Sequence, residues 1–345
     1  MRNVRAVLAG LIVAAAAIQG TPLAAAGKTR PPSVEEVMTR LGYTAQDKKA
    51  LLSGKIVSTD VKRTRDDQLI AAVAVVLPVP IASLAEGPKQ GRNIERDSGV
   101  LAFGALSEAA GAEQLGDVSY AATEMDEVKR LLKVKPSDTF NLSSEEIAVL
   151  RAGLGKLDGK DRATAEAVSK AYREVLAGRL SAYLDKGLDG IAPYDHGGKT
   201  FSPAKELRAV YKQAEPFLSE YFPGFKEALA EFPKGQSSDI TSRIYWMKRA
   251  VEGRPAFILA HQMVEAGDDY VLMSHRQFFV GHTYDSLQVV ALALPVQGGS
   301  AVFYVNSAFT DKVTGFFSGV AHSVGQGRMK DDLTKYFETV RETNK

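Results

Sequence analysis

The sequence predicts an α+β fold in which an antiparallel sheet is wrapped on a long C-terminal helix, with a large inserted helical subdomain. The first observation is a series of apolar runs within residues 240–311, each closed by Gly, Pro, Asp or Asn, as consecutive antiparallel strands are. The second is a change of apolar spacing to about 3.6 residues within residues 107–233, which indicates helices. The third is a return to helical spacing over residues 310–341. The apolar runs cover residues 243–248, 256–264, 270–279, 287–294 and 301–306.

Residues 1–26 have the composition of a secretory signal peptide. Arg2 and Arg5 supply a positive start, and residues 6–18 form an apolar stretch too short to span a bilayer comfortably. Small residues precede a cleavage point after Ala26. An uncleaved membrane anchor is the alternative, which the lack of a long apolar flank disfavours. The chain has no cysteine, so a lipid anchor on cysteine is excluded, and we expect a periplasmic or secreted protein.

The composition is that of a folded globular protein. The 345 residues are enough for one large domain or two ordinary ones, and 45% of them are hydrophobic and 24% charged. Signal cleavage would remove Arg2 and Arg5 from the 43 basic residues and nothing from the 41 acidic ones, so the two charges balance. A neutral chain has no global attraction for nucleic acid or anionic lipid. We expect no nucleic-acid partner and, after cleavage, no stable membrane span.

The first β-rich part, residues 27–106, combines a hairpin with short helices. Ser33 is placed to cap the first helix. An alternating run and a continuous apolar run flank a polar turn, which is typical of a β-hairpin. Pro78 and Pro80 end the second strand because they cannot donate to a strand ladder. The expected elements are a helix at 34–41, strands at 55–61 and 69–77, a short helix at 81–86 and a strand at 100–106.

The inserted helical subdomain, residues 107–235, contains two recognisable helix starts. Ser143 and Glu146 have the spacing of a capping box, in which each side chain satisfies the other residue's free amide. Ser202 followed by Pro203 is a second start, since proline at the first helical position loses no hydrogen bond. Residues 236–345 then complete the β domain. The apolar stripe of the final helix consists of Met329, Leu333, Tyr336, Phe337 and Val340.

No catalytic or metal-binding motif is complete. Residues 197–200, Gly-Gly-Lys-Thr, resemble the end of a phosphate-binding loop, but Pro193 replaces the glycine that such a loop needs, so a polar turn is expected. No Gly-x-Ser-x-Gly elbow occurs. A metal site at His261, His275 and His282 would need a bulge, because the odd spacing of the last two places them on opposite strand faces. We therefore predict no catalytic residue, no metal and no cofactor.

Polar residues within the apolar strands leave two explanations open. On regular strands, His261 shares a face with Phe257, and His275 shares a face with Phe279, while Arg276 points the other way. Each polar group either has an internal hydrogen-bond partner or contacts the head group of a ligand in a cavity. The predicted ligand-binding residues are Phe257, Leu259, His261, Met263, Val271, Met273, His275, Arg276 and Phe279.

An N-terminal strand pair, a short helix, several antiparallel strands and a long C-terminal helix together resemble the helix-grip plan of the START-like superfamily. The matching parts are residues 55–86 and 240–341, and the large helical insertion is a departure. The resemblance implies a curved sheet around the last helix, with an apolar cavity between them, and it transfers no catalytic residue. The chain also looks like secreted bacterial proteins that carry a Tyr-Trp strand and a later His-x-Tyr strand start, here Tyr245-Trp246 and His282-Thr-Tyr284.

Three hypotheses for the function follow. The favoured one is a non-catalytic protein that binds an apolar or amphipathic small molecule, such as a lipid, between the sheet and the C-terminal helix. The second is a START-like cyclase or hydrolase using His261, His275 or Tyr284, which requires two of them within hydrogen-bond reach in one pocket. The third is a cell-envelope interaction protein, which a large exposed apolar patch on residues 207–232 would favour.

Overall fold

The computed structural model describes residues 30–90, 94, 97, 99–107, 111–154, 157, 162–314 and 318–343. Pro31–Lys345 forms one compact unit. The expected signal peptide, residues 1–26, lies outside the described residues.

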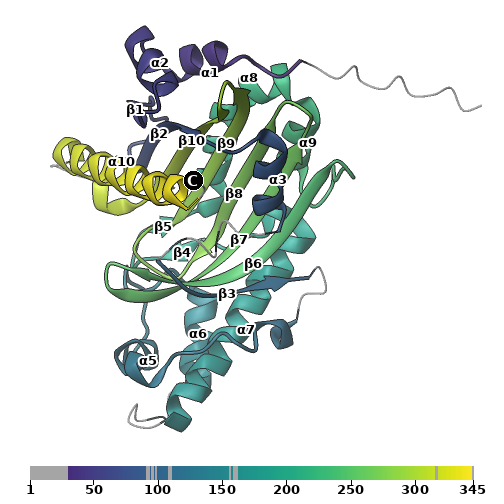
Figure 1. Ribbon diagram of the computed structural model, residues 1–345. Helices are drawn as coiled ribbons and strands as arrows, with labels where there is room; N and C mark the ends of the chain where they lie inside the picture. The colour runs from purple at the N-terminus through teal and green to yellow at the C-terminus, as the bar shows by residue number, and fades with distance from the viewer. Residues whose placement is uncertain are drawn as a thin grey trace, which may run out of the picture. The chain divides into compact units, whose positions relative to one another are not determined.

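The predicted α+β class is confirmed, and its centre is an eight-stranded antiparallel sheet (Figure 1). The strand order is β1-β2-β10-β9-β8-β7-β6-β3, so the first long strand lies beside the last one. The strands are β1 (Val57–Asp60), β2 (Gln68–Leu77), β3 (Val100–Leu106), β6 (Ile240–Val251), β7 (Arg254–Ala266), β8 (Val271–Val280), β9 (Ser286–Val296) and β10 (Gly299–Phe309). Each predicted strand is therefore present, and β6, β7, β9 and β10 are longer than their apolar runs.

The helices begin where the capping residues predict. The Ser33 hydroxyl accepts from the Glu36 amide, and Ser143 and Glu146 form the expected reciprocal capping box. Ser202 caps the helix that starts with Pro203. The helices are α1 (Val34–Leu41), α2 (Ala45–Leu52), α3 (Ile81–Lys89), α5 (Met125–Leu132), α6 (Ser144–Leu154), α7 (Arg162–Lys186), α8 (Pro203–Tyr221), α9 (Pro223–Glu231) and α10 (Ser318–Glu342).

The Gly-Gly-Lys-Thr segment forms a turn, as expected. Residues 197–200 connect β4 (Tyr194–Asp195) with β5 (Thr200–Phe201), a small separate hairpin between α7 and α8. Gly197 and Gly198 have φ values of 72° and 99°, a left-handed backbone that glycine adopts without a steric penalty.

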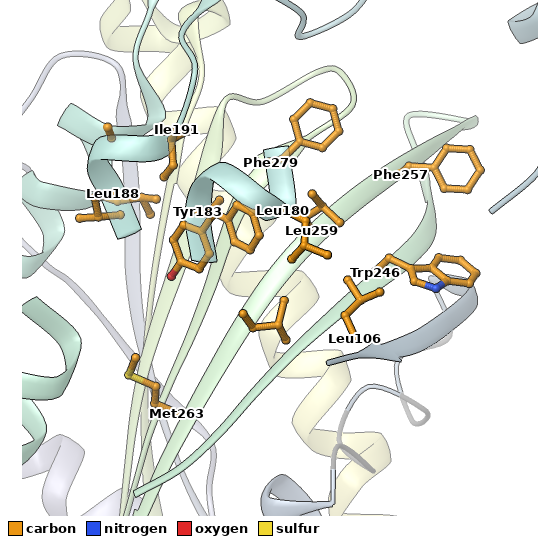
Figure 2. Close-up of a cluster of buried hydrophobic side chains, with 14 of the residues drawn as sticks. Leu106, Leu180, Tyr183, Leu188, Ile191, Trp246, Phe257, Leu259, Met263 and Phe279 are labelled. Carbon is orange, nitrogen blue, oxygen red and sulfur yellow. The ribbon is translucent and has the colours of Figure 1, made fainter. Parts of the chain in front are cut away.

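One face of the sheet is covered by the predicted helical subdomain. The sheet and the helices α5 to α9 share a single hydrophobic cluster, to which β6, β7, β8 and β10 all contribute. Figure 2 shows part of it, with Leu180 and Tyr183 of α7 beside Leu259 and Phe279 of the sheet. The apolar side chains of α8 and α9 are buried in this cluster, among them Leu207, Leu218, Phe225 and Leu229. The helical part is thus one wall of the same core.

The opposite face carries α10 and α3 (Figure 1). The α10 stripe packs on β2, where Leu333 and Phe337 meet Val73 and Val75, and the Phe337 ring lies 5.4 Å from that of Tyr304 in β10. The helix α3 instead covers the ends of β7, β8 and β9.

The expected wall of the cavity is not beneath the C-terminal helix. None of the predicted ligand-binding residues belongs to the cluster that α10 forms with β2 and β10. The stripe of α10 predicted that this helix packs on a sheet, but it carried no information about which strands receive it.

A β-bulge corrects one predicted face. Leu259 of β7 pairs with Phe279 of β8, whereas Ala260 pairs with Gln277, so Phe278 is an extra residue. Phe279 therefore leaves the face of His275 and points to the helical layer, where it lies 6.2 Å from the Tyr194 ring. Phe278 stacks on Tyr183 at 3.9 Å on the same side. The regular alternation of side chains between the two faces of a strand, on which the predicted faces depend, is interrupted at Phe278.

Phe337→Ala should lower the free energy of unfolding by about 3–5 kcal/mol, because it removes a ring that is 4% exposed between α10 and β2. Val320→Ala, on the same helix but 67% exposed, should change it by less than about 0.5 kcal/mol. Urea denaturation of both variants measures the difference. Equal effects of the two substitutions would contradict the packing of α10 on β2.

Candidate functional site

The predicted ligand-binding residues lie on two faces of the sheet, so they do not line one space. Val271, Met273 and His275 of β8 face α3. The others face the helical layer: Phe257, Leu259, His261, Met263, Arg276 and Phe279. All six of these are 2% exposed or less, which places them in the core between the sheet and the helices.

His261 lies between two hydroxyl groups. Its Nδ1 is 2.8 Å from the hydroxyl of Tyr183 in α7, and its Nε2 is 2.7 Å from the hydroxyl of Ser242 in β6. The Tyr183 hydroxyl also accepts a hydrogen bond from Arg276 at 3.3 Å. Nδ1 of His261 is the acceptor within reach of the Tyr183 proton, so we assign this proton to that contact. The imidazole proton then sits on Nε2, which donates it to Ser242.

The distance between Ser242 and His261 is that of a catalytic nucleophile and its general base, but the protonation state of His261 does not suit a base. Ser242 is exposed, yet in this tautomer Nε2 has no lone pair with which to take the serine proton. Burial, and then the neighbouring Arg276 cation, lower the pKa of His261 well below its usual range, so that an imidazolium is costly at this position. His261 is therefore a structural link between α7 and the sheet.

Arg276 is bonded entirely within the protein. It is 1% exposed and donates to the Leu229 carbonyl of α9 at 3.1 Å and to Gln288 of β9 at 3.4 Å. Gln288 in turn donates to Ser274 at 3.2 Å. The sheet separates this guanidinium from α10, so Arg276 cannot reach a ligand held on that side. Of the two explanations for polar residues in these strands, the internal-partner explanation fits His261 and Arg276.

His275 belongs to a second polar network on the other face. The Tyr284 hydroxyl donates to Oε1 of Gln277 at 2.6 Å. The amide nitrogen of Gln277 then faces Nε2 of His275 at 3.2 Å, so the ring accepts there and carries its proton on Nδ1. Burial, and then the Arg249 cation, lower the pKa of His275 to about 4, which keeps the ring neutral at physiological pH.

The network continues from His275 to helix α3. Nδ1 of His275 is 3.2 Å from the Tyr245 hydroxyl, which donates to Oε1 of Gln262 at 2.8 Å. Gln262 donates through its amide to the carbonyl of Pro88 in α3 at 2.6 Å. Every member donates to the next one, and the last bond attaches α3 to β7. The network therefore fixes one side of the region between α3 and α10.

The face between these two helices remains partly open. On β8, β9 and β10, a contiguous set of side chains on this face is only partly buried: His275, Leu287, Val302, Tyr304 and Asn306. We call this set the α3–α10 surface. On the other face of the same three strands, the partly exposed residues are Val290, Val296, Gly299 and Val305. The α3–α10 surface combines aliphatic side chains with hydrogen-bonding groups, which is the composition of small-molecule sites.

Sequence reasoning identified His275 on this surface but missed Tyr304 and Asn306. Both lie in the last apolar run, and Asn306 was interpreted only as the residue that closes it. Their position on the α3–α10 face follows from the pairing of β10 with β2 and β9, which the sequence alone does not give. An asparagine directly after the apolar residues 301–305 is the available signal.

The remaining histidines are held apart by separate partners. Nε2 of His196 is 3.0 Å from Oδ1 of Asn141, His282 bonds to Thr283, and His322 bonds to the Asp66 carbonyl. Across the ranges that the structure describes, no group of three His, Cys, Asp or Glu residues could hold a metal ion.

Two surface hollows are lined by several exposed charged side chains together with apolar ones. One, of about 290 Å³ beside the end of α5, is bordered by exposed Lys129, Lys133 and Lys135. The other, of about 610 Å³ between α7, α8 and α9, is bordered by exposed Lys186 and other charged side chains of both signs. Exposed charges of this kind contribute little binding energy because water screens them. We therefore place the candidate site on the α3–α10 surface.

A pair of buried carboxyl groups joins α8 to the start of β9. Glu206 is 1% exposed and accepts from the Ser286 hydroxyl at 2.7 Å, while Asp285 is 2% exposed and its Oδ2 has no hydrogen-bond partner. Burial, and next the charge of Glu206, raise the pKa of Asp285 to about 8. Burial likewise raises the pKa of Glu206 to about 7. Asp67 and Asp311 add negative charge nearby.

A scan of protein-family models, a search of curated proteins and a search of solved structures each returned no match to this chain. Within the described ranges, no helix combines the length and hydropathy that crossing a membrane requires.

Asp285→Asn should stabilise the protein increasingly as the pH rises from about 4 to 8. The folded pKa of about 8 lies above the unfolded value of 3.8, so folding favours the protonated acid. The free-energy cost of ionising Asp285 in the folded protein is absent below pH 3.8 and fully present above about pH 8. Unfolding free energies of both proteins across this range measure the effect. Asp331→Asn, at an exposed position, should show no such trend, and a pH-independent Asp285→Asn effect would contradict the assignment.

A fluorophosphonate probe, which labels activated serines, should not label Ser242, because His261 donates to this hydroxyl instead of accepting its proton. Intact-protein mass spectrometry of the wild type and of Ser242→Ala after incubation with the probe makes the comparison. A single adduct that appears on the wild type and disappears in Ser242→Ala would contradict the tautomer and revive a hydrolase function.

Proposed function

We propose that this protein is a periplasmic or secreted, non-catalytic protein that binds an amphipathic small molecule on the α3–α10 surface. The observation that supports this most is the partial exposure of Leu287, Val302 and Tyr304 on the sheet face that carries α3 and α10. Apolar surface left open and flanked by secondary structure is typical of ligand grooves.

The lining divides into an apolar and a polar part. Leu287 and Val302 pack with Met273 and Val271 in one hydrophobic cluster, which an aliphatic tail would extend. His275, Tyr304 and Asn306 lie close to it on neighbouring strands. A ligand with an apolar body and a hydrogen-bonding end matches both parts.

A helix-grip architecture remains part of the proposal. The sheet order supports it, because β2 near the start of the chain pairs with β10 near its end, and α3 and α10 lie on one face. The helical layer on the opposite face is the departure that the sequence indicated. The periplasmic or secreted location is proposed from the leader and the lack of cysteine.

The two other hypotheses have weaker support. His275 and Tyr284 both bond to Gln277 and not to each other, and His261 lies on the opposite face, so no two of these residues form the required pair. Most apolar side chains of residues 207–232 are buried in the core, and Tyr211, Phe217 and Tyr221 are partly buried against it, so they form no large exposed patch.

Purified protein should bind the uncharged fluorescent probe N-phenyl-1-naphthylamine, with increased emission as the probe enters the α3–α10 surface. Leu287→Lys should weaken this binding at least about tenfold, because it places an ammonium group in the apolar part of the surface. Val149→Lys adds the same charge at an exposed position on α6 and should leave binding unchanged. Native mass spectrometry should also detect co-purified small molecules. An absence of probe binding, or equal loss in both variants, would overturn the proposal.

A further inference from the structure

We propose that the head group bound on the α3–α10 surface is uncharged and donates a hydrogen bond to Asn306. This inference rests on the proposed function and specifies the chemical class of its ligand: an uncharged lipid-like molecule with a hydroxyl or amide end.

Asn306 has an acceptor that the protein leaves unpaired. Its Oδ1 is buried and has no hydrogen-bond partner among the described residues. In the sheet, Asn306 pairs with Ala71 of β2 on one side and with Val289 of β9 on the other, and neither side chain can donate. A buried acceptor without a donor is costly, so a group that supplies a donor here is bound more tightly than one that cannot.

The neighbouring Tyr304 supplies the complementary function. It lies two residues before Asn306 on the same face, and no hydrogen bond of its hydroxyl is present in the described part of the chain. A head group that donates to Asn306 can therefore accept from Tyr304. An alcohol carries both functions on one oxygen, and a primary or secondary amide carries them on the oxygen and nitrogen bonded to one carbon.

Among the described residues, the charged groups beside this surface are paired or neutral. His275 is neutral, because burial lowers its pKa to about 4. Arg249, the nearby cation, pairs with Asp97 at 2.8 Å, and Lys330 of α10 pairs with Asp60. Burial also raises the pKa of Tyr284 to about 12, so this hydroxyl stays protonated. A carboxylate or an ammonium group would lose its hydration without gaining a free counter-charge.

The test is displacement of N-phenyl-1-naphthylamine by three ligands with the same oleoyl chain at pH 8. Monooleoylglycerol carries hydroxyl groups, methyl oleate has no donor, and oleate is charged. Monooleoylglycerol should bind at least about threefold more tightly than methyl oleate, as one net hydrogen bond predicts. Oleate should bind at least about tenfold more weakly than monooleoylglycerol.

Asn306→Leu should abolish the preference for monooleoylglycerol over methyl oleate and retain binding of the probe. Gln236→Leu removes an amide at an exposed position between α9 and β6 and should keep the preference. Circular dichroism confirms folding of both variants, and Tyr304→Phe, which loses only the donor hydroxyl, should reduce the preference without affecting the fold.

The possible failures are distinguishable. Binding of the probe together with equal or tighter binding of oleate, or an unchanged preference in Asn306→Leu, overturns the uncharged head group and leaves the proposed function standing. Failure of the wild type to bind the probe and all three oleoyl ligands overturns both proposals.

Discussion

The arrangement of the whole molecule depends on how the buried Arg276 is accommodated in the core between the sheet and the helices. A buried cation without partners costs more than a fold of this size can tolerate, so its donors must be matched by fixed acceptors. Here they are the Tyr183 hydroxyl of α7, the Leu229 carbonyl of α9 and the Gln288 side chain of β9. The helices α7 and α9 are thereby held in one geometry against β8 and β9, which apolar packing alone specifies less strictly.

The polar residues continue across the sheet in register. His261, Arg276, Gln288 and Ser307 are successive cross-strand partners on β7, β8, β9 and β10. Gln68 of β2 then donates to Ser307 at 3.3 Å. On the opposite face, the corresponding row contains His275 and Asn306, and there the pairing is incomplete. The side chains of the first row all have hydrogen-bond partners among the described residues, whereas Oδ1 of Asn306 in the second row has none, which is the physical basis for placing the ligand on the second face.

Most of the fold could be predicted because its signals are local. Ser33, Ser143 and Ser202 define helix starts through contacts with amides three residues away, and prolines such as Pro78 end strands by the loss of a donor. The candidate site could not be predicted in the same way. The two faces of β8 exchange at Phe278, where an extra residue enters the strand, and neither composition nor spacing announces such a bulge.

The position of α10 illustrates the same limit. The apolar residues Leu333 and Phe337 predict that one side of the helix is buried. The strands β2 and β10 lie beneath that side only because they pair with each other across more than two hundred residues of chain. The role of Asn306 depends on the same pairing. Contacts between distant segments, and not the residue types themselves, decide which polar groups are left without partners.

The bonds from Tyr284 through His275 to the Pro88 carbonyl all point the same way. Rotating one carboxamide by half a turn would therefore set a donor against a donor at one of its ends and an acceptor against an acceptor at the other. All hydrogen bonds of this network therefore donate in the same direction, and no single one can reverse without the others. A substitution at one of these positions is expected to require a compensating substitution at a neighbouring one. Related sequences should therefore show covariation among the residues of the network.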